Sequence, residues 1–124
     1  MSKKYEARIS ELVRVRLATL LESRVSDPRV AGITITDVEV TSDTRYARVY
    51  YSLIGSAEEK EAAGRGLESA AGFLRHELGQ SLRTKRIPEL AFIYDDSLER
   101  GERMSRVLDD VKARDAQRPV SGNE

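Results

Sequence analysis

Cysteine is missing from this sequence of 124 residues, which excludes a disulfide framework, a thiolate metal site and a cysteine nucleophile. A long apolar run is missing too, because no stretch approaches the roughly 20 residues needed to cross a bilayer. The first residues, MSKKY, lead into no apolar signal core. We therefore expect a soluble, cytoplasmic protein, and the lack of cysteine fits a reducing compartment.

Net charge is also missing, since 21 Lys and Arg balance 21 Asp and Glu. The total therefore indicates no strong attraction of the whole molecule to phosphate. The charges are unevenly placed, however. Residues 1–86 hold 15 basic and 12 acidic side chains, or +3, and residues 87–124 hold 6 and 9, or −3. The chain is thus a weak electrical dipole with its positive part first.

Length and composition predict one globular domain, because two domains within 124 residues would each be too small to stand alone. Hydrophobic residues make up 40% and charged residues 34% of the chain. These values are typical of a folded protein with a heavily charged surface.

The N-terminal part predicts a helix followed by a β-hairpin. Residues 5–25 place their apolar side chains in one stripe of a helix, and Pro28 ends that helix near Ser26. The stripe consists of Ile9, Leu12, Val13, Leu17, Leu20 and Leu21. Residues 33–41 and 45–54 are rich in β-branched and aromatic residues and flank a turn, as in a hairpin. The apolar phase shifts within the first strand, which indicates either a bulge near Asp37 or burial of both faces.

The remaining residues predict further helices and a third strand. Ser56 and Glu59 have the spacing of a capping box, so a helix begins there. We expect a kink at Gly72 that divides this helix in two, because glycine costs about 1 kcal/mol relative to alanine inside a helix. Residues 88–94 predict a strand entered through proline.

A last helix should begin with Asp96 or Ser97 as its cap. Its apolar residues, at helical spacing, are Met104, Val107, Leu108 and Val111. The apolar pattern stops at residue 113, and we expect residues 113–124 to form a flexible tail. The order of elements predicts an α+β fold in which helices back one three-stranded sheet.

Several short motifs follow one another over residues 5–108. They are Arg8-Ile9, Ser26-Asp27-Pro28-Arg29, Ser42-Asp43, Tyr46-Ala47-Arg48-Val49-Tyr50, Gly72-Phe73-Leu74-Arg75, Pro88-Glu89-Leu90 and Tyr94-Asp95-Asp96-Ser97. In this order the sequence resembles the ribosome-binding factor A family. The resemblance implies a single KH-like RNA-binding domain of type II topology over residues 1–112, in which Ala70-Ala71-Gly72 replaces the usual Gly-x-x-Gly loop by a kink.

The resemblance also implies a function without catalysis and without a cofactor. Family members bind the immature small (30S) ribosomal subunit and its 16S rRNA and assist late maturation and rRNA processing. An assembly GTPase promotes their release. We expect the same partners here, no membrane association, and a monomer.

Basic residues at the end of the second long helix are the first candidates for RNA contact. Arg83, Lys85 and Arg86 follow a helix that also displays Arg75, so this patch could exchange condensed cations for phosphate contacts. The alternative is that these side chains sit in solvent and favour the helix C-terminus electrostatically. Within Ala70-Ala71-Gly72, the missing Cβ of Gly72 could let an RNA backbone approach.

The first helix and the hairpin offer weaker candidates. Lys3, Lys4, Arg8 and Arg14 lie away from the apolar stripe and are either phosphate contacts or a solvated face. Arg16 projects within the stripe, which indicates snorkelling or an ion pair. Tyr46, Arg48 and Tyr50 share one face of a strand, as in a base-stacking platform, although tyrosine on an outer sheet face is also common for its β propensity.

Catalytic and metal sites are not indicated. His76 has no second histidine or cysteine with which to form a zinc site, and Asp95 and Asp96 are expected to cap the following helix. A phosphate loop with lysine and a serine elbow are both absent from the sequence. A hydrolase using His76, Asp95 and Asp96 is thus a remote alternative, and a protein-docking scaffold acting through the acidic last helix is a second one.

Overall fold

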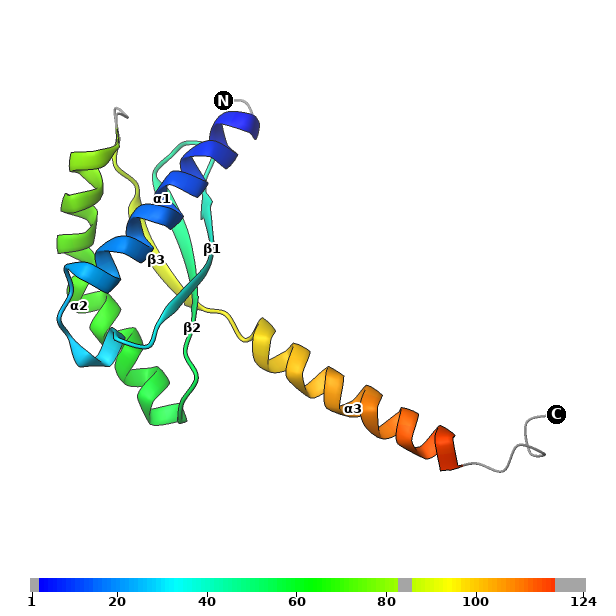
Figure 1. The fold of residues 1–124 in the computed structure, drawn as a ribbon. Coiled ribbons are helices and arrows are strands. Elements are labelled where there is room, and N and C mark those ends of the chain that lie inside the picture. Colours follow the sequence, from blue (N-terminus) through cyan, green and yellow to red (C-terminus); the bar gives the residue numbers. More distant parts are fainter. Residues whose placement is uncertain (1–2, 83–85, 118–124) are drawn as a thin grey trace.

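The computed structural model describes residues 3–82 and 86–117. Its elements follow the chain in this order: α1 (Lys3–Ser23), the short 3-10 helix η1 (Pro28–Val30), β1 (Thr34–Val40), β2 (Tyr46–Ser52), α2 (Ala57–Ser81), β3 (Glu89–Tyr94) and α3 (Ser97–Gln117) (Figure 1). The three strands form one sheet. The predicted α+β fold with a three-stranded sheet is therefore confirmed.

β2 is the central strand of the sheet, with β1 antiparallel on one side and β3 parallel on the other. The register of β1 against β2 shifts between Ile35 and Asp37. This bulge lets Ile35 and Val38 both face the core, although three positions separate them. The bulge alternative is thus confirmed, and it explains the change of apolar phase in the sequence.

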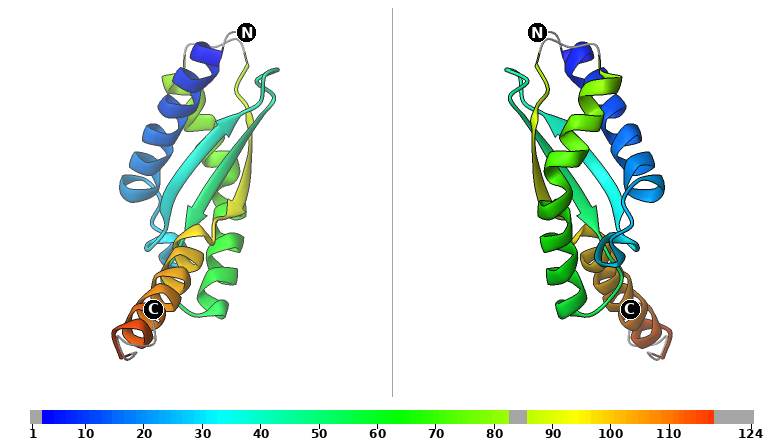
Figure 2. Two further views of the ribbon diagram at one scale, coloured as in Figure 1. Left: turned by 90° about the vertical axis from the view of Figure 1, so that its right-hand side faces the viewer. Right: turned by 90° about the vertical axis from the view of Figure 1, so that its left-hand side faces the viewer.

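One face of the sheet is covered by α1 and α2, and the other face is open (Figure 2). Along β2, Ala47, Val49 and Tyr51 are buried, whereas Tyr46 and Arg48 are exposed. This alternation follows from the period of two of a β-strand. The open face is thus where side chains of β2 meet solvent.

The sequence predicts a helix over residues 5–25, and α1 spans Lys3–Ser23; one residue of the predicted apolar stripe does not face the core. Leu12 is 51% exposed, while its neighbour Val13 is fully buried. With 3.6 residues per turn, Leu12 points about a quarter turn away from Val13 and misses the sheet. Arg16 donates from Nε to Ser81 Oγ at 2.8 Å, so it joins α1 to the end of α2 rather than pointing freely into solvent.

The α2 helix begins with the predicted capping box, in which the Ser56 hydroxyl and the Glu59 carboxylate each accept a backbone N–H. The chain then stays helical to Ser81. Two helices separated by a kink were expected, and one continuous helix is found, whose axis bends along its length in Figure 1. Buried Leu67 and Leu74 hold the helix to the core on both sides of the expected break, and this packing outweighs the low helix propensity of glycine.

The α3 helix points away from the rest of the protein (Figure 1). Its first turn is tied to the rest of the fold, because the Glu99 carboxylate accepts hydrogen bonds from the Lys60 ammonium and the Tyr94 hydroxyl. The apolar residues predicted for this helix are all exposed: Met104, Val107, Leu108 and Val111. They lie in α3 as predicted, but they do not join the core.

The start and end of α3 differ in detail from the sequence prediction. Asp95, one of the two aspartates expected to cap this helix, accepts the first free N–H, that of Ser97, through Oδ1 at 2.9 Å. Asp96 pairs instead with Arg100, Oδ1 to Nε, at 2.9 Å. The helix continues to Gln117, through the first part of the predicted tail. Residues 118–124 lie outside the described residues, so a flexible tail stays a prediction.

Candidate nucleic-acid interface

Two adjoining hollows lie where the C-terminal half of α2 meets the start of β3. The larger, of about 630 Å³, is lined by Gly72, Arg75, His76, Gly79, Gln80, Arg86 and Ile87. The smaller, of about 260 Å³, is lined by Arg45, Tyr46, Arg75, Arg86, Ile87 and Glu89. Arg75, Arg86 and Ile87 line both hollows, so we call the two hollows together the α2–β3 groove. The groove is lined by the guanidinium groups of Arg45, Arg75 and Arg86 and by the carboxylate of Glu89.

The Arg75 side chain is held in the α2–β3 groove by two hydrogen bonds. Its Nη2 donates to Ile87 O at 2.9 Å and its Nε donates to Pro88 O at 3.3 Å. Arginine has five N–H donors, so three remain for a ligand while the side chain stays in one place. The charge predicted to contact RNA is therefore preorganised, and it also ties α2 to the entry of β3.

Gly72 opens the wall of the larger hollow. A Cβ added at this position would meet nothing within 4 Å, so packing does not require glycine here. The residue is exposed on α2, three positions before Arg75. The helix surface is thus open at Gly72, and close approach of an RNA backbone there stays a prediction. Ala70, by contrast, lines a different hollow with Arg24 and Phe73, and Ala71 is half-buried.

Among the described residues, the other predicted cations lie on α1 and at the entry of β3. Arg83 and Lys85 lie outside the described residues, as does the side chain of Lys3, whereas Lys4 and Arg8 are exposed on α1. Arg86 lies in the groove with Arg75. Of the eight predicted contact residues whose side chains the structure describes, Gly72, Arg75 and Arg86 lie together in the groove.

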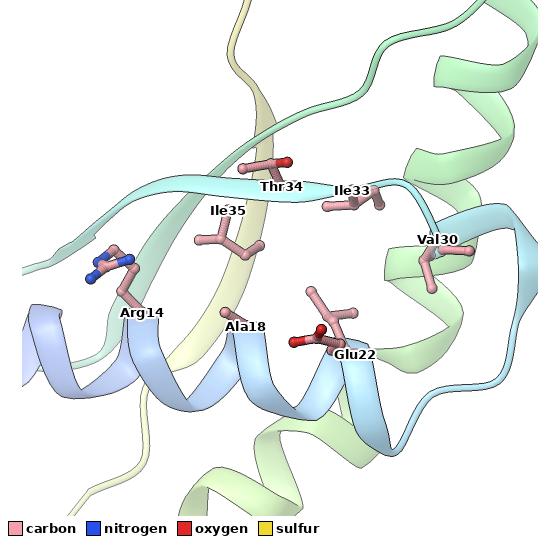
Figure 3. Close-up of a pocket in the computed structure, with 9 residues that line it drawn as sticks. Arg14, Ala18, Glu22, Val30, Ile33, Thr34 and Ile35 are labelled. Carbon is pink, nitrogen blue, oxygen red and sulfur yellow. The ribbon is translucent and has the colours of Figure 1, made fainter.

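Arg14 belongs to a separate hollow between α1 and β1, of about 420 Å³. Figure 3 shows Arg14, Ala18 and Glu22 of α1 lying across from the chain at residues 33–35. Arg14 Nε donates to Glu11 Oε2 at 2.9 Å, and this hydrogen bond lowers the pKa of the Glu11 carboxyl. β1 and β3 are opposite edges of the sheet, so Arg14 and the α2–β3 groove are separate sites.

The predicted stacking platform on β2 is only partly open. Arg48 Nη1 pairs with Glu39 Oε1 at 2.8 Å across the strands, and Tyr50 is half-buried. Tyr46 is 49% exposed and lines the smaller hollow beside Arg45. Arg45 is a groove residue that the sequence did not indicate, because its place there depends on the parallel pairing of Tyr46 with Glu89.

The residues named for enzyme chemistry have structural partners. Asp95 Oδ2 accepts from the Thr36 hydroxyl at 2.6 Å, and this bond, followed by that from the Ser97 N–H, lowers the pKa of the Asp95 carboxyl. His76 is exposed on α2 beside Gln80. Within residues 3–82 and 86–117, no three His, Asp or Glu side chains are placed to hold a metal ion, and no helix is long and apolar enough to span a membrane.

Comparison with known proteins decides the family. The family model described as "Ribosome-binding factor A" matches residues 5–108. The chain belongs to the ribosome-binding factor A family. A ribosome-binding factor A from Nitrosomonas eutropha is 45% identical over 104 residues, which cover 84% of this chain and 89% of that protein. The resemblance seen in the sequence motifs is therefore confirmed over most of the chain.

Solved ribosome-binding factor A structures share the fold. The crystal structure of ribosome-binding factor A from Thermus thermophilus superimposes with a TM-score of 0.65 at 26% identity, covering 72% of this chain and 94% of that one. A Thermus thermophilus homology model fitted into a cryo-EM map of a 30S–ribosome-binding factor A complex gives 0.55 at 25% identity, covering 74% and 92%. The KH-like type II fold implied by the resemblance is confirmed.

Proposed function

We propose that this protein binds the immature small (30S) ribosomal subunit and its 16S rRNA and assists late maturation and rRNA processing without catalysis. Membership of the ribosome-binding factor A family supports this function. The observation that carries it in the structure is the α2–β3 groove, where Arg45, Arg75 and Arg86 meet. Guanidinium groups bind phosphate in bidentate geometry, so the groove fits an RNA backbone.

Binding alone is sufficient for such a role. A protein that binds the immature conformation of the subunit more tightly than the mature one shifts the population toward it, by its difference in affinity. Neutral net charge limits attraction to RNA in general, and local charge at the groove supplies the attraction where contact occurs. The protein would thus hold a folding intermediate of the RNA and leave when that conformation is lost.

The wider set of contacts belongs to the same proposal. Lys3, Lys4, Arg8, Arg14, Ala70, Ala71, Gly72, Arg75, Arg83, Lys85 and Arg86 are the proposed RNA-contacting residues, with the α2–β3 groove at their centre. Residues 1–112 are the proposed RNA-binding domain; of the predicted tail, residues 113–124, the first five continue α3, and a flexible tail is proposed for the residues that follow. The protein is proposed to act as a cytoplasmic monomer, and an assembly GTPase is its proposed release factor.

A second candidate function is protein docking through α3. The exposure of Met104 and Leu108 favours it, because apolar side chains grouped on a surface often mark a protein–protein interface. The salt dependence of binding distinguishes the two functions, because contacts to phosphate weaken steeply as salt rises whereas apolar docking does not.

Co-sedimentation with purified immature and mature small subunits, over a series of salt concentrations, tests the proposed function. We expect the protein to pellet with immature subunits at low salt, less with mature subunits, and progressively less as salt rises. Absence of binding at low salt would refute the proposal. Salt-insensitive binding would favour protein docking through α3.

A further inference from the structure

The smaller hollow of the α2–β3 groove combines an aromatic ring with cations. It lies where β2 and β3 both begin, and the Glu89 N–H donates to Arg45 O at 2.8 Å to close the pairing there. Its volume of about 260 Å³ is just below the range typical of small-ligand pockets. A hollow of this size has room for about one residue of an extended strand.

Tyr46 forms the aromatic wall of this hollow. The side chain is 49% exposed because position 46 faces the open side of the sheet. The aromatic contact found among the described residues joins Tyr51 to Tyr94, so among these residues no aromatic ring stacks on Tyr46. A nucleobase stacking on an aromatic ring is sequence-tolerant, because every base has a π-face.

Arginine side chains line the same hollow as this ring. The Arg45 side chain is 62% exposed and has Asp43 Oδ2 only at 3.9 Å from its Nε, a weak pairing. Arg75 is fixed by the carbonyls of the β3 entry. Glu89 is the one carboxylate in the lining, and three guanidinium groups outweigh it.

We propose that this hollow is a subsite for one unpaired nucleotide of single-stranded RNA, whose base stacks on Tyr46 and whose phosphate binds the guanidinium groups of Arg45 and Arg75. The subsite rests on the proposed function and adds a preference to it: the RNA must present an unstacked base. Side chains reach the bases of RNA chiefly in such single-stranded segments. Tyr46 is then a contact residue, and its partner is a single strand rather than a helix.

A tryptophan placed at this position reports stacking directly. The natural sequence contains no tryptophan, so Tyr46→Trp introduces a single fluorophore, and Ile54→Trp, just beyond the other end of β2 and also exposed, is the control outside the proposed contacts. The probes are immature small subunits and a mixed-sequence RNA decamer, the latter single-stranded or annealed to its complement. We expect RNA binding to quench Tyr46→Trp emission, with the single-stranded decamer preferred, and to leave Ile54→Trp emission unchanged.

Two further variants separate the ring from its hydroxyl group. Tyr46→Ala should weaken binding about tenfold, a loss within the range of base–aromatic stacking, and Tyr46→Phe should stay within about twofold of the wild type. Equal losses in both variants would overturn the stacking proposal, as would Tyr46→Trp emission that does not change when immature subunits bind. In either case the proposed function would stand. Wild-type protein that binds neither probe would refute both.

Discussion

Gly72 is a position where stability and RNA binding should respond in opposite directions. An alanine Cβ at this site would meet no atom within 4 Å, and the residue lies inside α2. Replacing glycine by alanine in an exposed helix interior stabilises by about 1 kcal/mol. For a folded body of roughly 100 residues, this corresponds to about 4 °C in Tm. Gly72→Ala should therefore melt about 4 °C higher than the wild type.

The same methyl group should weaken binding to immature subunits, because it occupies the wall of the α2–β3 groove where the RNA backbone would approach. We expect a loss of roughly tenfold, equal to about 1.4 kcal/mol of binding free energy. Thermal melting by circular dichroism measures the first effect and co-sedimentation the second. A protein that is both more stable and a weaker binder cannot be explained by partial unfolding.

Two other glycines in helices serve as controls. Gly101 lies in α3, where a Cβ would also meet nothing within 4 Å, so Gly101→Ala should leave binding unchanged. Gly66 packs against η1, where a Cβ would come within 2.8 Å of Val30 Cγ1. Overpacking of about 1–3 kcal/mol exceeds the helix gain there, so Gly66→Ala should destabilise by about 1 kcal/mol. Unchanged binding by Gly72→Ala, or a lower Tm, would refute the reasoning about Gly72.

The remaining predictions concern three other parts of the fold. Arg75→Ala removes the bonds to Ile87 O and Pro88 O, and urea unfolding should show a loss of about 1–2 kcal/mol; no loss would mean that Arg75 does not pin β3. Leu108→Glu, on the exposed face of α3, should change the unfolding free energy by less than about 0.5 kcal/mol, and a larger loss would reveal a partner for that face. The Thr36 hydrogen bond lowers the pKa of Asp95. It therefore stabilises the fold at pH values above the ordinary carboxyl pKa of about 3.9, and this stabilisation is lost as the pH falls through the lowered pKa. The Tm difference between wild type and Thr36→Val should therefore narrow in acid, and a constant difference would contradict this origin.

Local patterns in the sequence predicted most of the fold. The capping box at Ser56 and Glu59, the phase shift near Asp37 and the entry of the third strand through Pro88 each depend on interactions within a few residues. Such interactions hold wherever the segment lies. The continuity of α2 depends instead on the burial of leucines on both sides of Gly72. That burial is a property of the packed core, and local helix propensity does not predict it.

The candidate site was less predictable, because it is assembled from distant segments. The basic character near Arg75 and Arg86 was visible in the sequence, and both lie in the groove. Arg45 joins them only because β2 and β3 run parallel with Tyr46 opposite Glu89, and no local pattern specifies that register. Arg14, in turn, is placed at the opposite edge of the sheet by the path of α1.

The salt dependence of binding by a charge-reversed groove tests the central claim most directly. Arg45→Glu/Arg86→Glu is compared with Arg65→Glu, which changes an exposed side chain of α2 paired with Glu61 and outside the groove lining. We predict that the groove variant binds immature subunits more weakly and that its slope of log affinity against log salt is shallower by about 0.7–0.9 per lost phosphate contact, while Arg65→Glu matches the wild type. Equal slopes for all three proteins would contradict RNA binding through the α2–β3 groove.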